Sequence, residues 1–419
     1  MAVTLPLPAK RPLFQLGPAT LVTAAFIGPG TVVTASLAGA NYGYALLWAL
    51  LFSVVATMIL QEMAARLGIV TGEGLGENLR KMVRQPLLKA LLYALVVAAV
   101  IIGNSAYQGG NLTGASLGAD AIWGQHSVVV GLKQLIGLNP WALLLGAVAV
   151  AVLWHGRYRL IERCLIGLVL LMSLAFISTM FLTKPAFGAM LGGLLLPVIP
   201  TGATLTVIAL IGTTVVPYSL FLHAASSANK WQQQPDKINA LAESAADLRT
   251  AIPLGGLITL AVLSTAATAY FGKGVVLNNA GDLALSLQPL FGAAATYLMA
   301  LGLLAAGLSS AITAPLAAAY ALRGLLQLSP SQFRLTWLLI MLIGIVVSSL
   351  GLRPLSIIWF AQVANGILLP IITLCLLAAV NSPLMGAYHN SRRQNLQGFA
   401  VFSATLLLSG RTLYLAFFS

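Results

Sequence analysis

Charged residues are scarce in this chain. They make up 7% of its 419 residues, whereas a soluble domain carries about 25%. Hydrophobic residues make up 59%. Too few residues are charged to cover a water-exposed surface. The composition therefore excludes a soluble protein and indicates a polytopic membrane protein. Cysteine is also rare: Cys164 and Cys375 both fall inside apolar segments, which favours packed thiols over a disulfide.

Several motifs that carry chemistry are missing from the chain. It contains no CxxC, no HExxH and no P-loop pattern, so neither a zinc site nor an ATP-driven pump is indicated. Acidic residues number only nine, and by hydropathy Glu62 alone falls within a membrane span. Its simplest role is an ion pair with Arg66, four residues along the same helix. We expect no enzymatic activity and no cofactor.

Eleven hydrophobic segments can be counted, and most reach the roughly 17–25 residues that a membrane-spanning helix needs. The fourth and ninth are short. The segments cover residues 14–38, 44–68, 87–115, 140–155, 160–183, 201–228, 251–273, 290–324, 335–350, 354–381 and 395–418. Residues 231–249 form the most polar stretch and predict an amphipathic cytoplasmic helix between two spans.

The basic residues predict the orientation of these spans. With the N-terminus inside, 17 Lys and Arg residues fall in inside segments and four in outside loops, as the positive-inside rule requires. The C-terminus is then outside. The net charge of +13 is dispersed over short loops, which argues against nucleic-acid binding. We expect an integral protein of the bacterial cytoplasmic (inner) membrane, in contact with the lipid bilayer.

Two of the apolar segments are interrupted by glycine and proline. The first is broken at Gly28-Pro29-Gly30-Thr31 and the sixth at Gly212-Thr213-Thr214, with Pro217 following. Paired breaks at matching positions are typical of secondary transporters with inverted repeats, and unwound backbone at membrane depth lines a cavity. We predict a single transmembrane domain, with inverted five-helix repeats over 14–185 and 198–385 and an eleventh helix over 395–418.

The same segments carry sequence motifs of a known family. The first contains Ala25-Phe26-Ile27-Gly28-Pro29-Gly30-Thr31, and the second contains Gln61 followed by Ala64-Ala65-Arg66-Leu67-Gly68. The sixth contains Leu220-Phe221-Leu222-His223, the eighth Gly302-Leu303-Leu304-Ala305-Ala306-Gly307, and the tenth Gln362 and Pro370. From about residue 16 to 386 the chain resembles the Nramp family of transporters, which implies the all-α LeuT-type fold with eleven transmembrane helices.

The departures from the family pattern fall on its metal site. The family's first break reads Asp-Pro-Gly-Asn, whose Asp and Asn are metal ligands, but this chain has Gly28 and Thr31 there. The family's Met-Pro-His becomes Val216-Pro217-Tyr218. The acid of the third helix falls near Val100, and of two family histidines only His223 remains. The resemblance therefore implies the transporter scaffold without the transition-metal ligands, and we predict no metal ligand set.

This altered site predicts a small oxyanion, such as bicarbonate, as the substrate. Half-helices that start at the breaks present free N–H groups and positive dipole ends, and threonine hydroxyls add donors. The predicted substrate-binding residues are Gly28, Pro29, Gly30, Thr31, Thr34, Gly212, Thr213, Thr214, Val216, Pro217 and Gln362.

Other interpretations stay open at this point. The substrate could be a divalent cation that retains its water, such as Mg²⁺, a neutral solute or a zwitterionic amino acid. The protein could instead be a substrate sensor or a channel-like uniporter, and the small residues could serve helix packing alone. Coupling could use H⁺ through His223, Na⁺ through carbonyls, or no ion, and the oligomeric state is not predicted.

Five further side chains are candidates for the coupling or permeation pathway. They are Tyr218, His223, Asn104, Gln108 and Asn111. The last three share one helical face. That face either lines the path or makes hydrogen bonds between helices.

Overall fold

The computed structural model describes residues 17–418 except 21–22, 24–26, 84 and 157–158, and this part of the chain contains helices but no strand. The helices are α2 (Pro29–Tyr42), α3 (Leu47–Thr71), α4 (Leu75–Met82), α5 (Pro86–Trp123), α6 (Ser127–Ile136), α7 (Pro140–His155), α8 (Arg159–Leu182), α9 (Phe187–Leu195), α10 (Thr204–Thr214), α11 (Pro217–Lys230), α12 (Lys237–Tyr270), α13 (Ala280–Ala284), α14 (Gln288–Phe291), α15 (Ala294–Leu326), α16 (Pro330–Ser349), α17 (Pro354–Val380), η1 (Pro383–Tyr388) and α18 (Arg392–Phe418).

The described residues include nine candidate membrane spans, with α10 and α11 together forming one of them. Helices α6 and α7 meet at a bend of 92° and add a tenth if they are taken as one span. Of the first predicted segment, 14–38, residues 14–16, 21–22 and 24–26 lie outside the described residues, and α2 is its second half. The prediction of an all-helical polytopic membrane protein is confirmed.

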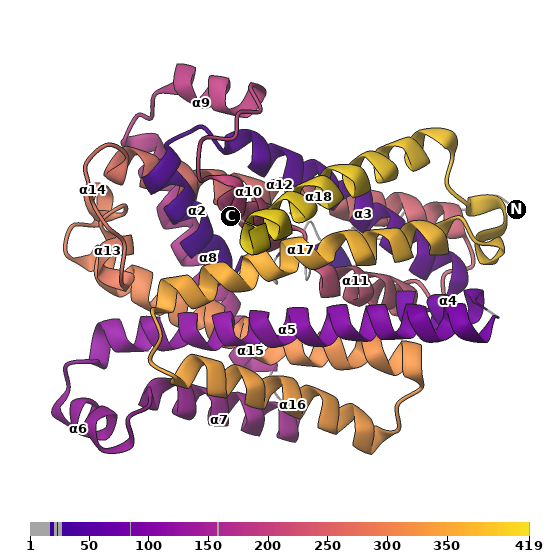
Figure 1. Ribbon diagram of the computed structural model, residues 1–419, viewed down its shortest axis with the longest axis horizontal. Coiled ribbons are helices and arrows are strands. Elements are labelled where there is room, and N and C mark those ends of the chain that lie inside the picture. Colours follow the sequence, from indigo (N-terminus) through magenta and orange to yellow (C-terminus); the bar gives the residue numbers. More distant parts are fainter. Residues whose placement is uncertain (1–16, 21–22, 24–26, 84, 157–158, 419) are drawn as a thin grey trace, which may run out of the picture.

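The longest helices run along the same axis, so the bundle has two distinct ends (Figure 1). Helix α5 packs along α15, α2 packs against α12, and α10 against α17. Helix α4 lies at one end, whereas α6, α13 and α14 lie at the other. The two breaks therefore fall between these ends, where α2, α10 and α17 meet.

The seventh span differs from its predicted bounds. We expected a separate polar helix over 231–249 and a span from 251, but α12 runs without interruption from Lys237 to Tyr270. Asp236 caps its start, because the carboxylate accepts hydrogen bonds from two backbone N–H groups at 3.0 and 3.2 Å. Pro253 lies inside the helix without ending it. The third span is also longer than predicted, since α5 continues to Trp123.

The predicted pairing of Glu62 with Arg66 is confirmed. Arg66 Nε lies 2.9 Å from the Glu62 carboxylate. The same guanidinium donates to the Tyr388 carbonyl at 2.7 Å and to Asn390 Oδ1 at 2.6 Å. The only acidic side chain predicted within a span is thus held in a network that joins α3 to the loop after α17.

Candidate substrate site at the two helix breaks

The second break lies slightly later in the chain than predicted. Helix α10 ends at Thr214 and α11 begins at Pro217, so residues 215–216 connect the two half-helices. Gly212, Thr213 and Thr214 form the last turn of α10 rather than the gap itself. At the first break, Gly28 is extended (φ −113°, ψ −175°) and directly precedes α2, which also begins with a proline, Pro29. Proline fits the first helical position, where no N–H is needed.

A hydroxyl pair connects the two broken segments. The hydroxyl oxygens of Thr31 and Thr213 lie 3.0 Å apart, and both side chains are buried. Thr214 contributes less to the gap, because its hydroxyl donates to the Leu210 carbonyl of its own helix at 3.1 Å. Thr34 lies one turn beyond Thr31 and is buried, without a hydrogen-bond partner among the described residues.

Two of the site glycines serve close helix packing. A β-carbon at Gly30 would collide with the side-chain amide of Gln362, and one at Gly212 would collide with the Gln362 backbone carbonyl on α17. The Gln362 Oε1 atom is buried and has no partner among the described residues. Gly28 differs, since a β-carbon there would lie 3.2 Å from Ser310 Oγ and 3.6 Å from the Tyr107 hydroxyl.

Tyr107 is a site residue that the sequence did not reveal. Its ring packs against Tyr218 on α11, with ring centroids 5.6 Å apart, and both rings are buried. It therefore closes the first break from the α5 side. An aromatic residue inside an apolar span carries no sequence signal that separates lining from packing.

The polar face of α5 is turned toward other helices. Gln108 Nε2 donates to the Ala311 carbonyl of α15 at 3.0 Å and also lies 3.0 Å from Met341 Sδ of α16. A β-carbon at Gly307 of α15 would lie 2.6 Å from the Asn111 carbonyl, and Asn104 Nδ2 donates to the Val100 carbonyl. Gln108 therefore makes hydrogen bonds between helices, whereas Asn104 bonds within α5 and Asn111 meets α15 through its backbone.

His223 belongs to a buried hydrogen-bond chain that ends at the second break. Its Nδ1 lies 2.7 Å from Gln61 Oε1, Gln61 Nε2 donates to Ser219 Oγ at 2.8 Å, and Ser219 donates to the Val216 carbonyl at 2.7 Å. A carbonyl can only accept, so every step of the chain is fixed in direction. The neutral His223 ring therefore carries its proton on Nδ1.

The backbone N–H groups proposed to hold an anion are already bonded. Thr31 N and Val32 N both donate to the Gly28 carbonyl, at 3.1 and 3.3 Å, and Val215 N donates to the Ile211 carbonyl at 2.8 Å. Thr213 and Thr214 lie inside α10, where N–H groups bond within the helix. The expectation of free donors after Gly30 and Gly212 was wrong, because the helices start earlier or end later than it assumed.

Two helix ends meet at the second break, since α10 ends there at Thr214 and α11 begins there at Pro217. The last carbonyls of a helix have no intrahelical partner, and α10 ends here at Thr214. The negative end of the α10 dipole and the positive end of the α11 dipole both face the gap, and the carbonyl oxygens come from α10. Together with the hydroxyls of Thr31 and Thr213, these oxygens form an uncharged acceptor set that suits a cation.

Broken apolar helices that meet around a buried polar gap define a polytopic membrane transporter of the LeuT type. The chain belongs to the Nramp family: the family model described as natural resistance-associated macrophage protein-like matches residues 19–415. A divalent metal cation transporter from Klebsiella pneumoniae is 29% identical to this chain over 96% of this chain and 94% of the relative. A second, from Caldanaerobacter subterraneus, is 27% identical over 97% and 94%.

Solved structures confirm the fold. The chain matches a manganese transporter from Eremococcus coleocola with a TM-score of 0.73 at 23% identity, over 94% of this chain and 84% of that one. It also matches MhsT in complex with L-phenylalanine with a TM-score of 0.57 at 18% identity, over 97% and 99%. The predicted family and LeuT-type fold are therefore both confirmed.

Proposed function

We propose that this Nramp-family transporter carries a divalent metal cation across the membrane by alternating access. The observation that carries the proposal is the acceptor set at the second break, where α10 ends beside the Thr31–Thr213 hydroxyl pair. The relatives at 27–29% identity are named as divalent metal cation transporters, which supports the same class of cargo here. The cargo is a substrate, released on the far side of the membrane.

The ion keeps much of its water shell in this proposal. Among the described residues, no group of three or more His, Cys, Asp or Glu side chains could hold a metal ion. Transition metals gain most from thiolate, thioether or imidazole ligands, whereas Mg²⁺ dehydrates reluctantly and keeps several waters. Neutral oxygens can accept hydrogen bonds from those waters, so a Mg²⁺-like hydrated ion is the cargo that fits best.

The oxyanion hypothesis loses its main support. The N–H groups that it required are bonded within α2 and α10, and the relatives named above are metal cation transporters. No specific contact favours a sensor or a channel-like uniporter. Calorimetric titration with Mg²⁺, Mn²⁺ and bicarbonate tests the cargo class directly, and uptake into proteoliposomes separates a carrier from a sensor.

Proton coupling remains a prediction, and His223 is its candidate residue. The ring is buried and Nδ1 is engaged by Gln61, while Nε2 has no partner among the described residues. Na⁺ bound by backbone carbonyls at the break is the alternative. For orientation we propose that the α4 end, which carries Arg80, Lys81 and Arg323, faces the cytoplasm, with the N-terminus inside and the C-terminus outside.

Replacing Thr213 by valine should weaken the cargo interaction. The change keeps the side-chain shape but removes a hydroxyl at the break, and one hydrogen bond to a charged group contributes about 1.5–3 kcal/mol. We expect the KM for Mg²⁺ uptake into proteoliposomes to rise by about ten- to a hundredfold.

Thr214→Val is the matched control for this substitution. It makes the same change one residue away, where the hydroxyl is bonded to the Leu210 carbonyl, so uptake should stay near that of the parent. Equal effects of the two variants would argue against a role of the Thr31–Thr213 pair in binding.

A further inference from the structure

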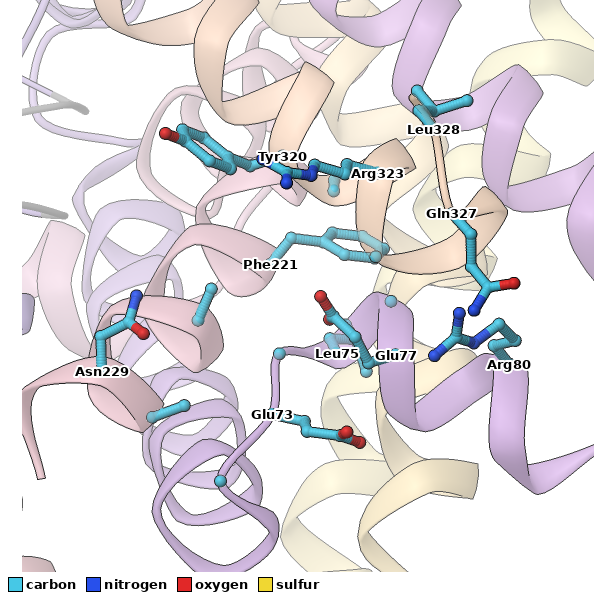
Figure 2. Close-up of a pocket in the computed structure, with 17 residues that line it drawn as sticks. Glu73, Leu75, Glu77, Arg80, Phe221, Asn229, Tyr320, Arg323, Gln327 and Leu328 are labelled. Carbon is cyan, nitrogen blue, oxygen red and sulfur yellow. The ribbon is translucent and has the colours of Figure 1, made fainter. Parts of the chain in front are cut away.

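A cavity of about 570 Å³ opens at the α4 end of the bundle. Helices α3, α11 and α15 all end beside it, and α4 begins there, so one wall is the backbone of residues 72–76. Figure 2 shows the ring of Phe221 and the carboxylate of Glu77 facing this space, with Arg80 and Arg323 at its edge. The cavity is thus a polar vestibule beneath the second half of the sixth span.

One face of α11 runs from the break to this vestibule. The vestibule-lining residues of α11 are Phe221, Ala225, Ala228 and Asn229, whose spacing of four, three and one places them on one helical face. Tyr218 continues that face toward the break. Pro217, at the break, is four residues before Phe221, which is about 6 Å along the helix axis. Between Phe221 and the end of α11, the side chains on this face are small or polar. Phe221 itself is 2% exposed.

One face of α15 follows the same course and consists of small residues. They recur at alternating spacings of four and three: Ser310, Ala314, Ala317, Ala321 and Gly324. The face begins beside the first break, since a β-carbon at Gly28 would lie 3.2 Å from Ser310 Oγ. The face ends at the vestibule, since a β-carbon at Gly324 would collide with the Glu77 carboxylate.

Two aromatic side chains lie on the α11 face between the break and the vestibule. Tyr218 packs against Tyr107 at the level of the break and belongs to the same buried cluster as Ala314 and Ala317. Phe221 lies one turn further and forms the inner end of the vestibule. No other aromatic residue lies on the α11 face between Phe221 and the end of that helix.

We propose that Phe221 is the gate between the helix breaks and the vestibule, and that the vestibule is the cytoplasmic exit of the transport path. The gate rests on the transport function proposed above, but it does not depend on which ion is carried. Opening requires the α11 face to move away from the small-residue face of α15, so that Phe221 leaves the route. The small side chains of α15 then leave room for an ion to pass.

A cysteine-labelling experiment tests the gate without any cargo. In a background with Cys164→Ala and Cys375→Ala, Val216→Cys places one thiol at the break. A membrane-impermeant maleimide is added to sealed vesicles from the vestibule side, which Asn229→Cys identifies by its own rapid labelling. We expect Phe221→Ala to speed the labelling of the thiol at position 216 by about tenfold or more, a change equal to about 1.4 kcal/mol in accessibility.

Phe176→Ala is the matched control. Phe176 is equally buried but lies on α8, off the route, so its loss should leave the labelling rate within about threefold of the parent. Equal acceleration by both variants would mean general loosening, and no acceleration by Phe221→Ala would mean no gate; either result overturns the proposal. If Phe221→Ala does not yield monodisperse protein, Phe221→Leu replaces it, with a smaller acceleration expected and the same decision rule.

Discussion

Gly28→Asp is expected to tighten the binding of a divalent cation by at least about tenfold. A carboxylate about 4 Å from a divalent ion gains about 2 kcal/mol even at the dielectric constant of water, twice the value for two unit charges. A β-carbon at Gly28 requires only a small shift of its nearest neighbour, Ser310 Oγ at 3.2 Å. Gly28 is extended rather than left-handed, and its nearest neighbours are the hydroxyls of Ser310 and Tyr107. Aspartate is also a favoured residue before a helix.

The same substitution separates the two cargo hypotheses, because they predict opposite signs. If an oxyanion occupied the break, the new negative charge would repel it and binding would be lost. Calorimetry with Mg²⁺, Mn²⁺ and bicarbonate on the parent and the Gly28→Asp protein measures both cation binding and oxyanion binding. Gly28→Asn keeps the shape without the charge and is the control. Weaker cation binding in the aspartate variant than in the asparagine variant would refute the cation assignment.

Tighter binding is not expected to restore fast transition-metal transport. By resemblance to the family pattern, Val216 stands where the family has methionine and Thr31 where it has asparagine. A single carboxylate then raises affinity without supplying the soft ligand that favours Mn²⁺ or Fe²⁺ over Mg²⁺. We therefore expect a gain in binding for Mg²⁺ as well as Mn²⁺, with little change in their ratio.

The sequence predicted the features that depend on backbone chemistry. Proline and glycine together often interrupt a helix, and they recur at matching positions in the first and sixth segments, so the paired breaks and the family resemblance could be read directly. The exact gap could not, because Gly212 looks like a breaker but lies inside α10, where a β-carbon would collide with the backbone of α17. Close helix packing and chain reversal both select glycine, and only the neighbouring helix decides between them.

The oxyanion prediction lost its support for a related reason. Free N–H groups were inferred from the position of the glycines, but one residue of shift in a helix end changes which groups are bonded. The Gly28 carbonyl accepts hydrogen bonds from the N–H groups of Thr31 and Val32. The sequence alone does not reveal this arrangement. Side chains on α5 were equally ambiguous, since periodicity gives a shared face for Asn104 and Gln108 without saying which helix it meets.

Gln61→Leu is expected to slow transport strongly while leaving a folded protein. Gln61 joins α3 to α11 by accepting from His223 and donating to Ser219. Leucine keeps the volume but leaves the His223 Nδ1–H without its acceptor, and a buried donor left unpaired costs about 1–3 kcal/mol. His223 loses the group that orients its ring, and Ser219 loses the donor from α3 while it keeps its own bond to the Val216 carbonyl. We expect a lower melting temperature and an initial uptake rate reduced at least about tenfold.

Gln108→Leu provides the matched control, since it removes a buried glutamine of α5 that bonds to α15 and α16 rather than to the break. It should lower the melting temperature by a similar amount and leave most of the uptake rate. A double variant, Gln61→Leu with His223→Leu, adds a second test. Residues in one hydrogen-bond chain do not contribute additively, so the double variant should be no more unstable than the worse single one. Additive losses of stability would mean that Gln61 and His223 act separately, which would contradict the hydrogen-bond chain that joins them.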